Sequence, residues 1–186
     1  MRLVHGVGFT DYPTCDGEGK HIKPYTLWKD MLYRCYSEKY QEKYPNYIDC
    51  KVCDEWHLFS NFKRFFDDNY IEGYELDKDL ISPKMKLYSP ETCIFVPHSL
   101  NSFLRFNGGR WRELPAGVTF NKSCRRYLAR INGDYVGGFP DAISANHAYI
   151  DAKIQAAKSY QPMCESIRPG LYENLISAIQ SMRVYE

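Results

Sequence analysis

The sequence of 186 residues lacks a long apolar run, a dominant charge and any internal repeat. No stretch of about 18 apolar residues occurs, so the sequence predicts no membrane-spanning helix. The first residues, MRLVHGVGFTDYP, lack the apolar region of a secretory signal. With 24 basic and 23 acidic side chains, the formal net charge is +1. This balance argues against a uniformly basic nucleic-acid coat and against an acidic disordered tail.

Aromatic side chains and thiols are what the sequence has in excess. Aromatic residues make up 16% of the chain, with 16 Tyr and 10 Phe, and they can supply a core even in small domains. Seven cysteines form a high and odd number. Because no export signal precedes them, we expect reduced thiols or metal ligands rather than a disulfide framework.

The charge is unevenly distributed along the chain. Residues 54–91 carry 5 basic and 9 acidic groups, a net charge of −4. Residues 105–135 carry 7 basic and 2 acidic groups, a net charge of +5. A local basic patch is typical of a protein that binds a phosphate backbone, although scattered arginines on a solvated loop would look the same.

The N-terminal half predicts helices and a strand pair. Leu27, Met31, Leu32 and Cys35 share one face of a helix that begins near Pro24. Residues 54–68 place aromatic side chains at helical spacing, which indicates core packing. Residues 74–81 and 92–96 predict strands, and a helix begins near His98.

The C-terminal part predicts three short strands and a helix. Short alternating runs cover GVTFN, YLARIN and YVGGF, with Gly133-Asp134 as a turn, and an Ala-rich helix follows Asp141. Alternation places Arg126, Leu128 and Arg130 on one face of the middle strand. The opposite face is then apolar and suits packing on the helix.

This part of the chain resembles the Apetala-type (ethylene-response-factor-like) DNA-binding domain over residues 114–158. The matching residues are Gly117-Val118, Tyr127 to Ile131, Gly137 to Phe139, Ala145, Ala148, Tyr149 and Ala152. Tyr127 stands where the family has tryptophan. The resemblance implies that the sheet enters the major groove of double-stranded DNA.

Six basic side chains are the candidate DNA contacts. Arg126 and Arg130 would face the groove, where an arginine can bind guanine or phosphate through two hydrogen bonds. The remaining candidates, for phosphate contact, are Arg110, Arg112, Lys122 and Arg125. The alternative is that these arginines only make the surface soluble.

Residues 26–101 resemble phage-encoded HNH endonuclease-like proteins, which often carry an Apetala-type domain behind them. The matching stretches are TLWKDMLYRCYS, CKVCDEW with SNF, ELDKD, and YSPETCIFV with Asn101. The resemblance implies a finger of two strands and a helix around one divalent ion, Mg²⁺ or Mn²⁺. It also implies a phage origin, with the host cytoplasm as the location, and homing-type endonuclease activity.

The resemblance assigns roles to five residues of this finger. Asp77 would be the metal-binding carboxylate and Asn101 the second ligand. Lys78 stands in place of the histidine that acts as general base, and a protonated lysine suits phosphate contact better than proton abstraction. Asp79 or His98 could act as base instead.

Four cysteines predict a structural zinc site. Cys50 and Cys53 form a CxxC pair, which is half of a common zinc knuckle. The HNH-like stretches add Cys35 and Cys93, and the four thiolates could hold Zn²⁺ tetrahedrally. The alternative is four buried thiols.

The sequence therefore predicts an α+β protein of two modules. An HNH-type ββα-metal finger with flanking helices would occupy residues 1–107, a linker residues 108–113, and a three-stranded antiparallel sheet packed on one helix, with a helical tail, residues 114–186. Two functions remain open. One is a metal-dependent DNA endonuclease or nickase, a hydrolase, and the other is a catalytically inactive DNA-binding or regulatory protein.

Overall fold

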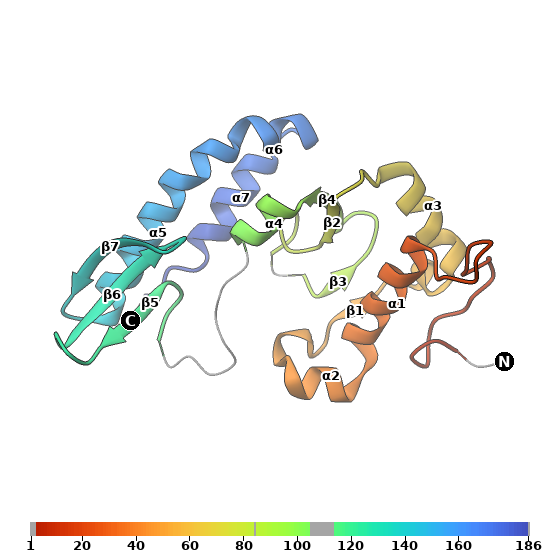
Figure 1. Ribbon diagram of the computed structural model, residues 1–186, viewed down its shortest axis with the longest axis horizontal. Helices are drawn as coiled ribbons and strands as arrows, with labels where there is room; N and C mark the ends of the chain where they lie inside the picture. Colours follow the sequence, from red (N-terminus) through yellow and green to blue (C-terminus); the bar gives the residue numbers. More distant parts are fainter. Residues whose placement is uncertain (1–2, 84, 105–113, 186) are drawn as a thin grey trace. The chain divides into compact units, whose positions relative to one another are not determined.

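The computed structural model describes residues 3–83, 85–104 and 114–185 (Figure 1). The chain forms two compact units, Met1–Pro97 and His98–Glu186, and each is described by itself. The predicted linker at 108–113 lies outside the described residues. The helix expected to complete the finger belongs to the second unit, so the ββα arrangement is not confirmed, whereas the α+β class is.

The first unit combines helices with short strands. Its helices are α1 (Lys23–Tyr36), α2 (Glu38–Lys43) and α3 (Phe59–Asn69), with 3₁₀ turns at Pro45–Tyr47 and Asp54–His57. Its strands are β1 (Lys51–Val52), β2 (Tyr74–Asp77), β3 (Leu87–Tyr88) and β4 (Ile94–Pro97). Strand β2 pairs antiparallel with β4, and β1 pairs parallel with β3.

An aromatic core holds the first unit together. Trp28, Trp56, Phe59 and Phe62 are all fully buried. The Nε1 of Trp28 donates a hydrogen bond to the carbonyl oxygen of Trp56 at 2.6 Å, which ties α1 to the turn before α3. The core packing predicted from the aromatic spacing of residues 54–68 is therefore confirmed. The segment is not one continuous helix, because Leu58 separates a 3₁₀ turn from α3.

The second unit contains α4 (His98–Leu104), a three-stranded sheet and a group of helices. The strands are β5 (Val118–Asn121), β6 (Arg126–Ile131) and β7 (Asp134–Phe139), antiparallel in the order β5-β6-β7. The later helices are α5 (Ala142–Ala157), α6 (Gln161–Ile167) and α7 (Leu171–Gln180). The predicted three-stranded sheet followed by a helix is confirmed.

Asp141 begins α5 as its N-cap. Its carboxylate oxygens accept hydrogen bonds from the Ser144 amide at 2.7 Å and the Ser144 hydroxyl at 2.9 Å. These bonds hold the pKa of Asp141 below its ordinary value. The side chain satisfies an amide that the first helical turn leaves without a partner, which explains where the helix starts.

Candidate nucleic-acid interface and metal centre

The side chains of the middle strand, β6, lie alternately on the two faces of the sheet. Ala129 is fully buried, and Tyr127 and Ile131 beside it are half-buried. Arg126 and Arg130 are exposed at the alternate positions. Because successive side chains of a strand point to opposite faces, the arginines occupy the face away from Ala129, as the alternation predicts.

The hairpin between β6 and β7 turns at Asn132 and Gly133, one residue earlier than predicted. Both have positive φ, +51° and +93°, and Ile131 pairs with Asp134 across them. Two consecutive residues with positive φ are typical of a type I′ turn, whose twist matches the flanking strands. The turn fixes the register that brings Tyr135 opposite Arg130.

Each arginine of the outer face is held by the backbone of the neighbouring strand or turn. Arg126 donates from Nη1 to the Gly138 carbonyl at 3.0 Å, and Arg130 donates to the Gly133 carbonyl at 3.3 Å. The Arg130 guanidinium also lies 5.7 Å from the Tyr135 ring centre. A guanidinium has five donors, so each keeps further N–H groups for a ligand.

The loop between β5 and β6 adds two further basic groups beside this face. Lys122 and Arg125 are exposed, and Arg125 has a positive φ of +53°. The Asn121 side chain accepts hydrogen bonds from the amides of Ser123 and Cys124, which shapes the loop. Arg110 and Arg112 lie outside the described residues.

Sequence reasoning missed Tyr135. Its side chain is 60% exposed on β7, which is unusual for so large an aromatic group. It lies opposite Arg130, but the register shift between Ala129 and Arg130 interrupts the alternation along residues 134–139, so the sequence pattern does not mark it as outward-facing.

Asp77 ends β2, opposite Ile94 of β4. Its Oδ1 accepts hydrogen bonds from the amides of Asp79 and Leu80, at 2.9 and 2.7 Å. Burial raises the pKa of this carboxyl group. The carboxylate of Asp77, which is the predicted metal ligand, therefore already accepts two backbone hydrogen bonds in the turn after β2.

Lys78 is 9% exposed and forms an ion pair with Asp79. Burial is the strongest single influence and acts against the charged form, but the hydrogen bond and the negative charge of Asp79, with smaller contributions from Cys50 and Tyr47, together raise the pKa of Lys78. Its ammonium group lies 5.8 Å from the Tyr88 ring centre. A lysine held protonated in this way suits phosphate contact better than proton abstraction, and its ion pair engages Asp79, so the catalytic roles of both residues stay predictions.

Asn101 and His98 belong to α4 of the second unit. Asn101 is 8% exposed, and Nε2 of His98 lies 3.0 Å from the Ser102 hydroxyl. Asp77 belongs to the first unit, so the predicted pairing of Asp77 with Asn101 stays a prediction.

The four predicted zinc ligands all belong to the first unit. Cys35, Cys50 and Cys93 are buried in its core, and Cys53 is half-buried beside it. Burial, and after it the neighbouring Cys50, raises the pKa of Cys35 to about 12, and burial raises the pKa of Cys93 to about 12. Within the described ranges, no group of three or more His, Cys, Asp or Glu side chains is arranged to hold a metal ion. The zinc site stays a prediction, and so does the alternative of four buried thiols.

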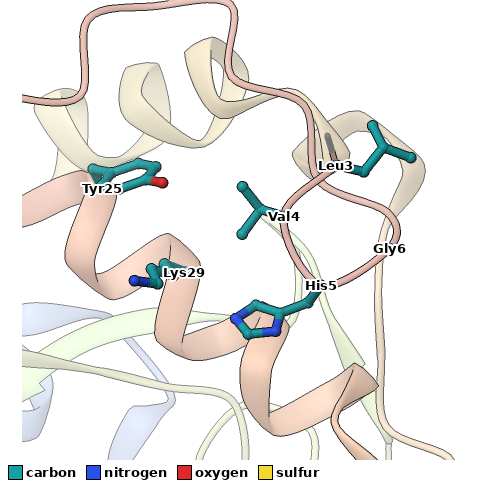
Figure 2. Close-up of a pocket in the computed structure, with 6 residues that line it drawn as sticks. All are labelled: Leu3, Val4, His5, Gly6, Tyr25 and Lys29. Atoms are coloured by element: carbon teal, nitrogen blue, oxygen red, sulfur yellow. The ribbon is translucent and has the colours of Figure 1, made fainter. Parts of the chain in front are cut away.

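An open cavity of about 550 Å³ lies between the N-terminal turn and α1 (Figure 2). Its lining consists of Leu3, Val4, His5, Gly6, Tyr25 and Lys29. Burial and then the nearby Lys29 lower the pKa of His5, so the imidazole is neutral near pH 7. None of the predicted site residues contributes to it.

Comparisons with protein-family models, with curated proteins and with solved structures each find no match for this chain. Over the described residues, no helix is both long and apolar enough to cross a membrane.

Proposed function

We propose that the protein binds double-stranded DNA through the outer face of the β5–β7 sheet. The observation that supports this most directly is the pair of exposed arginines on one face, each held in place by a backbone carbonyl. Side chains already ordered in this way lose less conformational entropy on binding than free arginines would.

The β-structure and the exposed arginines of the face suit the major groove. The groove is about 12 Å wide and accepts a narrow β-structure whose alternate side chains face the bases. Arg126 and Arg130 would bind guanine edges or phosphates, while Lys122 and Arg125 in the neighbouring loop would bind phosphate. A reducing cytoplasm, as expected from the free thiols, is the proposed compartment.

Fluorescence anisotropy with a labelled duplex of mixed sequence tests this proposal. Arg126→Ala and Arg130→Ala should each weaken binding by at least about fivefold, and each should reduce the slope of log K against log salt by up to about 1. Arg168→Ala is the matched control, because Arg168 is exposed in the same unit at the end of α6, away from the sheet. Equal effects of all three substitutions would refute the assignment of the sheet face.

A second candidate function is metal-dependent cleavage of the bound DNA. It is favoured by the position of Asp77, a carboxylate at the end of the first strand of an antiparallel pair, as an HNH-type finger requires. The resemblance supplies Asn101 as a second ligand for Mg²⁺ or Mn²⁺. Lys78 would then contribute charge rather than proton abstraction.

Nicking of supercoiled plasmid tests cleavage separately from binding. Asp77→Asn keeps an oxygen that can accept the two turn hydrogen bonds but removes the charge a metal needs. We expect this variant to bind the labelled duplex normally and to lose nicking with Mg²⁺ or Mn²⁺. Nicking that persists in Asp77→Asn would remove Asp77 from any metal site, and binding without nicking in the natural sequence would favour the inactive binder.

A further inference from the structure

A small hairpin in the N-terminal segment places a cysteine directly opposite a histidine. The Ile22 amide donates to the Thr14 carbonyl at 3.0 Å, and the Asp16 amide donates to the Lys20 carbonyl at 2.8 Å. Between these two bonds, Cys15 and His21 form an antiparallel bridge. Opposed residues of such a pair hold their side chains close together on the same face.

The turn of this hairpin is closed by a side chain as well as by the backbone. Oδ1 of Asp16 accepts hydrogen bonds from the amides of Glu18 and Lys20, at 3.0 and 2.9 Å. The Gly19 amide donates to the Asp16 carbonyl, and Gly19 has a positive φ of +79°. The turn is thereby held in one conformation, which fixes the two opposed residues relative to each other.

The thiol and the imidazole are in hydrogen-bond contact. Sγ of Cys15 lies 3.2 Å from Nδ1 of His21, and both residues are exposed. The His21 ring packs on the Tyr25 ring, with 4.8 Å between the centres, so a residue of α1 orients the imidazole. A nucleophile, a base within hydrogen-bond reach, and a third group that orients the base are the parts of an activated thiol.

We propose that Cys15 is a reactive thiol, activated by His21, which forms mixed disulfides with low-molecular-weight disulfides. The imidazole takes the thiol proton, and the resulting thiolate attacks one sulfur of the disulfide. A new S–S bond forms to Cys15 as the original S–S bond breaks, and the released thiolate takes the proton from His21. Cys15 is oxidised to the mixed disulfide, and one half of the reagent is reduced to a thiol.

Cys124 is an internal control in the same chain. Of the seven cysteines, all free, only Cys15 and Cys124 are exposed. The structure shows no side-chain hydrogen bond to the Cys124 thiol from any residue it describes. The two thiols share exposure and differ in their neighbours, because the Cys15 thiol has the His21 imidazole at 3.2 Å and the Thr14 hydroxyl at 3.7 Å.

The test uses the 186-residue protein with oxidised glutathione, and mass spectrometry of peptides gives the rate at each cysteine between about pH 6 and 9. His21 can take the proton of the Cys15 thiol during attack on the disulfide, whereas an unassisted thiol reacts only through its small thiolate fraction near neutral pH. Cys15 should therefore react at least about tenfold faster than Cys124 near pH 6.5, and the ratio should shrink as pH rises.

His21→Gln should reduce the rate at Cys15 to within about twofold of that at Cys124 and make the two pH profiles parallel. If the substitution only opened the hairpin, the rate at Cys15 would change by one factor at every pH, and that result would overturn the proposal. Equal rates at Cys15 and Cys124 in the natural sequence would overturn it too. An unchanged circular dichroism spectrum shows that the variant is folded, and an unchanged rate at Cys124 shows that the reagent acts equally on both samples.

Discussion

Gly117 is the position where a single added methyl group should damage the second unit most selectively. Its φ is +72°, a left-handed conformation that costs a non-glycine residue about 1–2 kcal/mol. A Cβ atom there would lie 2.1 Å from Cγ of Tyr149, far inside van der Waals contact. Tyr149 is only 7% exposed, so its ring has little room to move away.

The expected loss follows from adding these two effects. Overpacking in a well-packed interior costs about 1–3 kcal/mol, so Gly117→Ala should lower the free energy of unfolding of the second unit by about 2–5 kcal/mol. Gly133 is the matched control: its φ is also positive, at +93°, but a Cβ there meets nothing within 4 Å. Gly133→Ala should therefore show only the backbone cost of about 1–2 kcal/mol.

Hydrogen exchange at increasing urea concentration, read on peptides from β6 and α5, is the assay. Peptide resolution is needed because the chain has two units, and a single global unfolding transition need not report on the second one. Equal destabilisation by Gly117→Ala and Gly133→Ala would refute the packing of Tyr149 over Gly117, since the two positions share the backbone cost and differ in the steric contact.

Two further perturbations test buried groups. Lys153 is 3% exposed, and burial lowers its pKa to about 8. The unfolded chain then binds more protons between about pH 8 and 10.5, so stability should rise with pH there. Between about pH 7.5 and 9.5, the free energy of unfolding of the natural sequence should rise by about 2 kcal/mol relative to that of Lys153→Met. Urea denaturation measures both, and parallel pH dependences of the two proteins would contradict this expectation. In the first unit, Trp28→Phe removes the buried hydrogen bond to the Trp56 carbonyl and leaves a void. The free energy of unfolding should therefore fall by about 2–4 kcal/mol in the same assay. A loss below about 1 kcal/mol would contradict the packing of Trp28.

The sheet of the second unit could be predicted from the sequence because the patterns that indicate its strands span only a few neighbouring residues. Alternation across Arg126 to Ile131 predicts which side chains share a face, and the strand itself is long enough to show the pattern. Asp141 likewise marked the start of α5 correctly. The turn was misplaced by one residue, because Asn132 and Gly133 together adopt positive φ, whereas Gly133-Asp134 had been predicted.

Less of the first unit could be predicted from the sequence. Strands β1 and β3, which pair in parallel, have only two residues each, and an alternating pattern cannot be recognised over two residues. Helix α2 is six residues long and has no buried face, so no apolar pattern marks it. The hydrogen bonds of Lys78 and Asp77 also depend on the turn after β2, which residue identity alone does not describe.

The sequence by itself determined the helices with an apolar face, the alternating strands of the second unit and the location of its basic excess. These follow from periodicity and composition, which act over a few neighbouring residues. Only the tertiary structure decided that Lys78 is buried beside Asp79 and pairs with it, and that Cys15 meets His21 across a hairpin. A residue's protonation and reactivity depend on burial and on partners brought close by turns and packing, and those are properties of the folded chain.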